Sequence, residues 1–291
     1  MKTVDNAIIM AAGTASRFAP LSYERPKALI EVKGEILLER QIRQLLEAGV
    51  PEIILVVGYQ KEKFLYLQEK FGVQLVENPF YLTRNNHSSI WAVRDRLANS
   101  YICSSDNYFS ENPFEREVED SYYAAVYAHG KTAEWCMTED DEGYIDSVTI
   151  GGENAWYMLG HTFWSEEFSR GFLEILERIY PLPETAGLLW EAIFAKNLNV
   201  LKMKIRKYPE SRIFEFDTLD ELRQFDPSYR DHTRSAILSD LARRLSCGER
   251  DILEATAIKT RDNAAVGFTF RVHDKAYRYE YQSNKLGEIE L

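Results

Sequence analysis

Short apolar runs alternate with segments of helical periodicity over the first hundred residues of the chain. The apolar runs predict buried strands and cover residues 7–10, 53–57, 73–76 and 101–103. Helices are predicted at residues 60–70 and 88–97 from apolar residues that recur with the helical period. A further helix is predicted before the second strand, with one apolar face formed by Leu38, Ile42, Leu45 and Leu46. This alternation predicts an α/β fold with a mostly parallel sheet covered by helices on both faces.

The pattern changes near residue 122 to short apolar runs that are separated by turn residues. These runs predict antiparallel hairpins added to the sheet, and they cover residues 122–127, 134–138, 144–150 and 155–163. Further on, the pattern predicts two amphipathic helices, a strand and a last helix at residues 165–180, 184–195, 200–205 and 219–225. We therefore predict one large domain over residues 1–226.

Pro227 marks a predicted boundary to a small α+β appendage at residues 227–291. A helix is predicted at 233–245, and two alternating runs at 266–272 and 276–281 predict a hairpin. A helix and a hairpin bury too little apolar surface for an independent core. We expect this tail to dock on the main domain or on a second subunit, which would make a homodimer.

Composition narrows the class of protein. The chain has 291 residues, is 45% apolar and carries a formal net charge of −11, so a large core is available but a broad nucleic-acid-binding face is not expected. No 18-residue apolar run and no charged-then-apolar leader is found, which predicts a cytoplasmic protein that does not contact the membrane. Its three cysteines are far apart in sequence, and we assign them no chemistry.

A loop of small residues follows the first predicted strand and is suited to binding phosphate. Small side chains leave its backbone N–H groups uncovered, and its members are Ala11, Ala12, Gly13, Thr14, Ala15 and Ser16. Arg17 and Lys27 follow and can offset the charge of a triphosphate. The spacing excludes both a Walker loop and a dinucleotide fingerprint, because Ala15 and Phe18 stand where glycines are needed.

Polar residues follow later strands, at the edge where open α/β sheets bind ligands. Asn85, Asn86 and Ser88 can read a pyrimidine edge, although an N-cap role is as good an interpretation for any one of them. Asp106 follows the strand at 101–103 and is a candidate magnesium ligand, to which Asp217 can add a second carboxylate.

Tryptophans are concentrated in and after the predicted hairpins. Trp135, Trp156 and Trp190 can offer ring faces to a quaternary ammonium group, which cannot donate hydrogen bonds. Burial in the core is an equally good interpretation of each ring.

Together these features resemble the bacterial CTP:phosphocholine cytidylyltransferases of the sugar-nucleotidyltransferase superfamily, over roughly residues 5–226. The segments that carry the resemblance are A-A-G-T-A-S-R before Phe18, R-P-K-A-L around Lys27, V-V-G-Y ending at Tyr59, N-N-x-x-S from Asn85, S-D-N-Y around Asp106 and E-F-D ending at Asp217. The resemblance implies a Rossmann-like nucleotidyltransferase sheet. Two residues depart from the family pattern: Ala15 replaces a usual glycine, and Ser104 stands where an aspartate is common.

The resemblance also implies roles for the candidate residues. Arg17 and Lys27 would act on the CTP phosphates with the small-residue loop, and Asp106 and Asp217 would hold Mg²⁺. The loop at Asn85 would read cytosine, and the three tryptophans would line a choline pocket. The implied reaction makes CDP-choline and pyrophosphate from CTP and phosphocholine.

Two alternatives stay open at this point. The acceptor could be phosphoethanolamine, 2-aminoethylphosphonate or a sugar phosphate, since Glu134, Asp140 and Asp141 lie near Trp135 in sequence and could bind a primary amine. The chain could also be a nucleotide-binding protein without turnover. Its tail resembles the opening hairpin of the choline kinases, and no kinase activity is expected from it.

Overall fold

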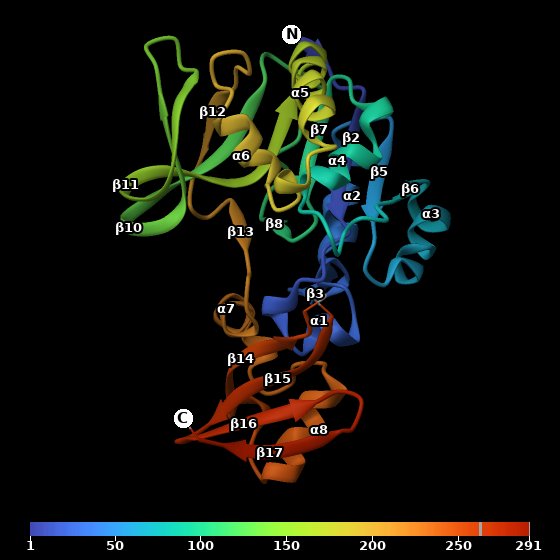
Figure 1. The fold of residues 1–291 in the computed structure, drawn as a ribbon, viewed down its shortest axis with the longest axis vertical. Helices are drawn as coiled ribbons and strands as arrows, with labels where there is room; N and C mark the ends of the chain where they lie inside the picture. The colour runs from blue at the N-terminus through green and yellow to red at the C-terminus, as the bar shows by residue number, and fades with distance from the viewer. Residues whose placement is uncertain (262–263, 291) are drawn as a thin grey trace. The chain divides into compact units, whose positions relative to one another are not determined.

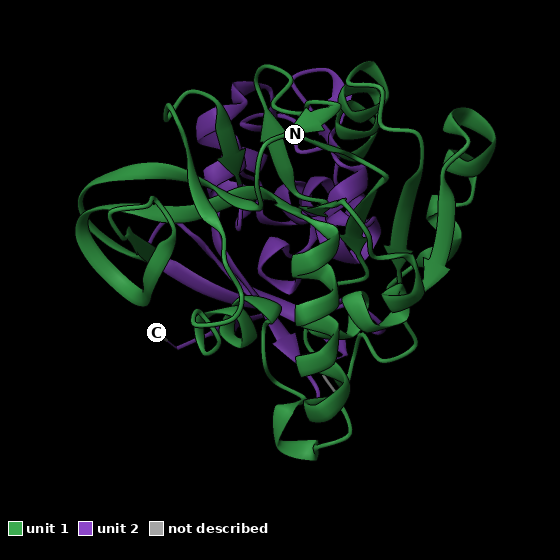
Figure 2. Ribbon diagram, turned by 90° about the horizontal axis from the view of Figure 1, so that it is seen from above, with its two compact units in different colours: residues 1–13, 38–215 green, residues 14–37, 216–291 purple. Residues whose placement is uncertain are grey.

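The computed structural model describes residues 1–261 and 264–290. The chain forms two compact units, each made of two separate stretches: unit 1 contains residues 1–13 and 38–215, and unit 2 contains residues 14–37 and 216–291 (Figure 2). The boundary predicted at residues 226 and 227 falls inside unit 2. Unit 2 therefore combines the predicted tail with the segment that carries Arg17 and Lys27.

Unit 1 is built on a seven-stranded sheet in the order β12-β10-β11-β7-β2-β5-β6 (Figure 1). The strands are β2 (Asn6–Ala11), β5 (Ile53–Val57), β6 (Gln74–Glu77), β7 (Ser100–Ser104), β10 (Tyr122–Glu139), β11 (Ile145–Trp164) and β12 (Lys204–Tyr208). Neighbours from β7 to β6 are parallel, and β11 joins β7 in the antiparallel sense. The predicted α/β class, with a mostly parallel sheet and added antiparallel strands, is confirmed.

Short elements complete unit 1. Two small pairings join β1 (Lys2–Thr3) to β9 (Glu117–Val118) and β8 (Asn107–Phe109) to β13 (Ile213–Glu215). The helices are α2 (Leu37–Glu47), α3 (Tyr66–Phe71), α4 (His87–Ala92), α5 (Glu166–Ile179) and α6 (Trp190–Ala195). Single 3-10 turns are η3 (Lys61–Phe64), η4 (Arg94–Arg96) and η5 (Pro183–Thr185).

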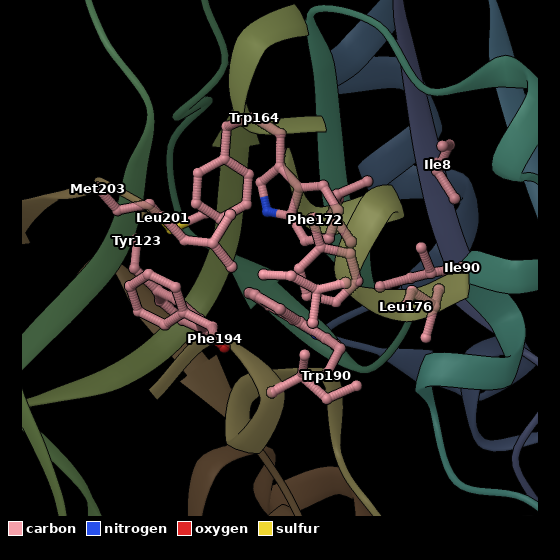
Figure 3. Packing of buried hydrophobic residues seen from close by; sticks show 14 of the residues in the cluster. Ile8, Ile90, Tyr123, Trp164, Phe172, Leu176, Trp190, Phe194, Leu201 and Met203 are labelled. Carbon is pink, nitrogen blue, oxygen red and sulfur yellow. The ribbon is translucent and has the colours of Figure 1, made fainter. Parts of the chain in front are cut away.

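The main core of unit 1 lies between the sheet and helices α4 to α6. Figure 3 shows Trp164, Phe172 and Trp190 at its centre, and each of these side chains is almost fully buried. Buried apolar residues of α2, such as Leu38 and Ile42, lie outside this cluster. The apolar side chains of α2 therefore pack in a different group from those of α4 to α6.

Several predicted elements differ from the structure. The runs predicted as four short strands are two long ones, β10 and β11, which are interrupted by shifts in pairing register. Gly130 and Gly151 lie inside them with positive φ, so these glycines bend a continuous strand where we predicted separate strands. The helices predicted at 88–97 and 184–195 are shorter, and Leu46 is 44% exposed because it lies off the buried face of α2.

Unit 2 carries a four-stranded antiparallel sheet in the order β14-β15-β16-β17. The strands are β14 (Ile252–Lys259), β15 (Ala265–Val272), β16 (Lys275–Glu280) and β17 (Lys285–Ile289). The predicted hairpin is the β15–β16 pair, in which Phe268 faces Tyr279. The outer strands β14 and β17 were not predicted.

The rest of unit 2 consists of short helices, turns and one small hairpin. They are η1 (Ser16–Phe18), α1 (Leu21–Glu24), η2 (Lys27–Leu29), β3 (Glu31–Val32), β4 (Glu35–Ile36), α7 (Leu219–Phe225), η6 (Pro227–Tyr229), α8 (Ala236–Leu245) and η7 (Glu249–Asp251). Phe268, Phe270, Tyr279 and Tyr281 of the tail are buried, together with Leu238 and Leu241 of α8. The tail also contacts residues 14–37 of the same chain, through the stacked rings of Tyr23 and Tyr281 and the hydrogen bonds of Glu24 with the start of α8. Among the described residues, no helix is both long and apolar enough to cross a bilayer.

Candidate active site

The first half of the small-residue loop is fixed by a close backbone approach in unit 1. Ala11 is the last residue of β2, and the carbonyl of Ala12 accepts a hydrogen bond from the N–H of Tyr59 at 3.1 Å. Gly58 permits this approach, because a Cβ at that position would lie 3.0 Å from the Ala12 carbonyl oxygen. Gly13 follows with open space around its Cα, so a ligand can reach this backbone.

The second half of the loop begins unit 2 and contains an unusual conformation. Ala15 has φ 45° and ψ 43°, in the left-handed region that favours glycine. Its carbonyl accepts a hydrogen bond from the N–H of Phe18 at 2.9 Å, which closes the turn η1. Thr14 and Ser16 on either side are half-buried. The alanine at this position therefore strains a turn for which glycine is better suited.

Arg17, Lys27 and Asp217 form an ion-pair cluster in unit 2. Arg17 Nη1 lies 2.8 Å from Asp217 Oδ2, and Lys27 Nζ lies 3.9 Å from Asp217 Oδ1. The Lys27 side chain is 8% exposed, whereas that of Arg17 is 74% exposed. Both cations lie beside the same carboxylate, and guanidinium and ammonium groups bind phosphate oxygens as they bind carboxylate oxygens. The structure thus brings together three residues that the sequence separates by up to two hundred positions.

Asp106, the other predicted metal ligand, belongs to unit 1. It is half-buried in the turn between β7 and β8, directly after the carboxyl end of β7. Its neighbour Asn107 donates from Nδ2 to Glu215 Oε2 at 3.2 Å. The pairing of Asp106 with Asp217 in one metal site stays a prediction. No cluster of three or more His, Cys, Asp or Glu side chains suited to a metal occurs in the parts of the chain that the structure describes.

Asn85, Asn86 and Ser88 tie their loop to the start of α6. The Asn86 amide oxygen accepts from the N–H of Trp190 at 2.8 Å, and its Nδ2 donates to Glu191 Oε2 at 3.0 Å. Asn85 Nδ2 donates to the carbonyl of Gly187 at 3.2 Å. Ser88 is buried and donates to the carbonyl of Asn85 at 2.8 Å. In the structure these groups position α6, and cytosine reading by them stays a prediction.

A cavity of about 150 Å³ lies at the carboxyl edge of the sheet in unit 1. Met10 and Ser104, which face each other at the carboxyl ends of β2 and β7, line it. Carboxylates, rings and a second thioether also line it, contributed by Glu191, Glu215, Tyr123, Trp190 and Met158. The cavity is at the edge where the sequence pattern predicts ligand binding.

Glu191 has a strongly shifted pKa in this cavity. Burial raises its pKa to about 7, and the hydrogen bonds from Asn86 and from the Tyr123 hydroxyl act in the opposite direction. Burial together with the nearby Glu191 and Glu215 carboxylates raises the pKa of Tyr123 well above its usual value. Tyr123 therefore stays a neutral donor, while Glu191 can change its charge near neutral pH.

Comparison with known proteins identifies the family. Residues 7–133 match the MobA-like NTP transferase domain. The choline-phosphate cytidylyltransferase of Streptococcus pneumoniae is 33% identical over 220 residues, which cover 76% of this chain and 96% of that protein. The 2-aminoethylphosphonate cytidylyltransferase of Lancefieldella rimae is 36% identical over 228 residues, covering 77% and 93%. This chain belongs to the cytidylyltransferase family.

A solved structure agrees with this assignment. The CTP:phosphocholine cytidylyltransferase from Streptococcus pneumoniae superposes with a TM-score of 0.74 at 33% identity, over 78% of this chain and 99% of that one. The fold class, the enzyme class and the resemblance inferred from sequence motifs are thereby confirmed. These relatives leave about a quarter of the cytidylyltransferase chain unmatched.

The tryptophans of this cytidylyltransferase occupy different environments. Trp190 lines the cavity at its edge but is only 1% exposed, with Tyr123 stacked on it at 5.6 Å between ring centroids. Trp156 lies on β11 with the Lys207 ammonium 5.4 Å from its ring centroid. Trp135 pairs with Ile150 across the hairpin. Trp135 and Trp156 are not among the described residues that line the cavity.

Sequence reasoning did not assign the two carboxylates of the cavity to a site. Glu215 is the first residue of the E-F-D segment and was predicted to share a face with Asp217, two residues on, but it received no role. Glu191 follows Trp190 directly, yet an acid in a predicted amphipathic helix is usually solvent-exposed. Its place in the cavity lining and its hydrogen bonds from Asn86 and Tyr123, which come from distant segments, mark Glu191 as part of a site.

Proposed function

We propose that this cytidylyltransferase transfers the cytidylyl group of CTP to phosphocholine, giving CDP-choline and pyrophosphate. The observation that carries the choice of acceptor is the cavity at the carboxyl edge of unit 1, with Glu191, Glu215, Tyr123 and Trp190 around it. It supplies negative charge and apolar surface in one small space. The relatives named above support the transferred group, because they are cytidylyltransferases.

The size and lining of the cavity suit a trimethylammonium head. A cavity of about 150 Å³ can hold a six-carbon ring, so a nitrogen with three methyl groups fits within it. Met10 and Met158 offer polarisable contact to methyl groups, and ring faces attract a diffuse cation. Glu191 already accepts hydrogen bonds from Asn86 and Tyr123, so it offers charge more than it offers hydrogen-bond acceptors.

The chemistry requires no general base. An anionic oxygen of the phosphocholine phosphate attacks the α-phosphorus of CTP, a new P–O bond forms, and the bond to the bridging oxygen breaks as pyrophosphate leaves with its electron pair. Arg17 and Lys27 are suited to stabilise the charge on the phosphates, because both cations lie at one place in unit 2, beside Asp217. Their contribution is orientation and electrostatic stabilisation.

Magnesium is the cofactor that we propose for this reaction. Asp106 and Asp217 would hold it, because carboxylate oxygens are the donors that this ion prefers. When bound, it supplies charge neutralisation on the CTP phosphates. The partners of Asp217 fit this role, since phosphates can replace the carboxylate at Arg17 and Lys27.

A second acceptor, 2-aminoethylphosphonate, has specific support. The Lancefieldella rimae relative acts on that compound according to its name, and its identity to this chain is 36%. Glu191 and Glu215 could accept hydrogen bonds from a primary ammonium group. Phosphocholine is our first choice because the same cavity also has rings and two methionine side chains.

Side-by-side rates of pyrophosphate release test both acceptors. The full chain is assayed with CTP and Mg²⁺ and, in turn, with phosphocholine, phosphoethanolamine, 2-aminoethylphosphonate and glucose 1-phosphate. We expect the highest kcat/KM with phosphocholine. A higher kcat/KM with 2-aminoethylphosphonate would favour that acceptor, and a higher value with phosphoethanolamine or glucose 1-phosphate would overturn both choices. CTP binding without pyrophosphate release would support a non-catalytic nucleotide-binding protein.

A further inference from the structure

The short helix α1 lies between Arg17 and Lys27 in sequence and is held by the tail of the chain. The Tyr23 ring stacks on the Tyr281 ring with centroids 3.7 Å apart and planes 8° apart. The next residue, Glu24, accepts hydrogen bonds at Oε1 from the N–H groups of Ala236 and Ile237, at 2.8 and 3.2 Å. The last two residues of α1 are thus joined to elements more than two hundred positions away.

The contact with α8 satisfies the start of that helix. The first N–H groups of a helix have no partner within the helix, and they favour a nearby negative charge. Ser235 accepts from the N–H of Leu238 as the N-cap, and Glu24 accepts from two further N–H groups. A charged acceptor on backbone N–H groups is among the stronger hydrogen bonds. The α8 helix therefore fixes the position of Glu24.

A second connection joins the tail to the segment that carries Asp217. The buried Arg223 of α7 donates to the carbonyls of Glu249 and Ile252, at 2.6 and 2.7 Å, and pairs with Asp220 at 2.9 Å. This network anchors α7, which begins two residues after Asp217. In the same unit, β14 packs against η1, which contains Arg17.

We propose that the tail, residues 227–290, is a positioning element for the phosphate-binding cluster of Arg17, Lys27 and Asp217. An isolated turn such as α1 has no stability of its own in water, because helix nucleation is unfavourable. Tyr281 and the start of α8 supply the missing contacts, and so set the path of the chain between Arg17 and Lys27. This inference rests on the proposed role of that cluster in binding CTP.

The test is Tyr281→Ala in the full chain, compared with Tyr281→Phe and Tyr277→Ala. Steady-state rates are measured with CTP and phosphocholine each varied. We expect Tyr281→Ala to raise the KM for CTP roughly tenfold, since small misplacements of binding groups are costly, and to leave the KM for phosphocholine unchanged. Tyr281→Phe keeps the stacked ring and should match wild type. Tyr277→Ala is the matched control, because Tyr277 stacks on Phe270 within the tail sheet.

A second pair of variants tests the same idea from the side of α1. Glu24→Ala should raise the KM for CTP, and Glu24→Gln should restore most of it because an acceptor oxygen remains. The effects of Tyr23→Ala and Tyr281→Ala on the KM for CTP should be less than additive in the double variant, since both changes remove the same stack. If Tyr281→Ala fails to fold, the comparison of Glu24→Ala with Glu24→Gln still tests the positioning role of the tail.

Several results would overturn the proposal. One is an unchanged KM for CTP in folded Tyr281→Ala and Glu24→Ala variants. Another is a fall in kcat with both KM values unchanged and no rescue by Tyr281→Phe, which indicates a merely structural role. If wild type binds CTP in calorimetry but shows no turnover, the proposed function fails separately, and the CTP dissociation constants of the same variants still test the tail.

Discussion

At the scale of single residues, Ala15 combines a strained backbone with a place beside Arg17. A left-handed conformation costs an L-residue roughly 1–2 kcal/mol, and glycine avoids this cost but loses about 0.4–1 kcal/mol through its freer unfolded chain. We therefore expect Ala15→Gly to raise the free energy of unfolding by about 0.5–1 kcal/mol. Chemical denaturation monitored by circular dichroism measures this change.

Ala12→Gly is the matched control in the same loop. Ala12 does not have positive φ and is buried, so the substitution adds freedom to the unfolded chain and removes a buried methyl group, and it should lower stability by about 1–2 kcal/mol. Equal losses in both variants would show that Ala15 is not strained in solution.

Glu191 gives the reaction a predicted pH dependence. Its carboxyl has a pKa of about 7 in the fold, so it is mostly protonated at pH 6 and mostly ionised at pH 8. An ionised Glu191 attracts a cationic head, so the KM for phosphocholine should fall as pH rises through 7, by roughly tenfold if only the ionised form binds. Because the pKa of Glu191 is higher in the folded protein than in the unfolded chain, the protonated carboxyl favours the fold. The stability that it contributes is complete below about pH 4.5 and is lost as pH rises to about 7.

The measurement compares wild type with Glu191→Gln between pH 6 and 8. The acceptor phosphate also titrates near pH 6, and it does so equally with both proteins. Subtraction therefore isolates Glu191. A KM ratio between the two proteins that is constant over this range would show that Glu191 does not titrate beside the acceptor.

Residues of the site differed in how well the sequence predicted them. Arg17 and Lys27 were identified from a local motif, because the small-residue loop and its cations are adjacent in the chain. Their ion pairs with Asp217 depend on a fold that joins segments two hundred residues apart, and no local pattern encodes those distances. The tryptophans were ambiguous for a physical reason, since the same ring can fill a core or line a pocket.

At the scale of elements, the segments with the clearest hydrophobic pattern were predicted most accurately. The strand Ile53–Val57 and the helix Leu219–Phe225 occur with the predicted bounds. The outer strands β14 and β17 were missed because their residues, such as Glu254 and Gly287, weaken the alternation that marks a strand. They are defined instead by pairing with the predicted hairpin.

The end of β5 offers a prediction about an element rather than a side chain. Gly58→Ala would place a Cβ 2.7 Å from the Tyr81 ring and 3.0 Å from the Ala12 carbonyl oxygen. We expect a loss of about 1–3 kcal/mol in stability, as for overpacking, and a higher KM for CTP because the loop must shift. Gly187→Ala is the control, since open space surrounds that position. Thermal melts and CTP kinetics of both variants test it, and similar behaviour of the two would refute the close-approach explanation.

At the scale of the whole molecule, the order of the chain and the division into units do not coincide. Residues 14–37 leave unit 1 after Gly13 and return to it at Leu38, and the chain leaves it again after Glu215. The sequence pattern predicted one boundary, at residue 226, which divides the chain into two continuous stretches. A single boundary of this kind cannot describe a unit that is made of two separate segments. The predicted metal ligands consequently belong to different units, Asp106 to unit 1 and Asp217 to unit 2.

This division leads to different expectations for the two carboxylates. Without divalent metal, Asp217 competes with the CTP phosphates for Arg17 and Lys27, so Asp217→Ala should bind CTP more tightly, by up to about fivefold for an ion pair that is partly exposed. With Mg²⁺, the same variant should lose roughly 10²-fold or more in turnover, because charge neutralisation is lost.

Asp106→Ala provides the comparison, since it should lose turnover without the gain in metal-free CTP affinity. Calorimetry in the presence of a chelator and pyrophosphate release with Mg²⁺ measure the two effects separately. If Asp217→Ala instead binds metal-free CTP more weakly, the carboxylate serves to hold Arg17 and Lys27 in place, and the competition argued from its ion pairs is wrong.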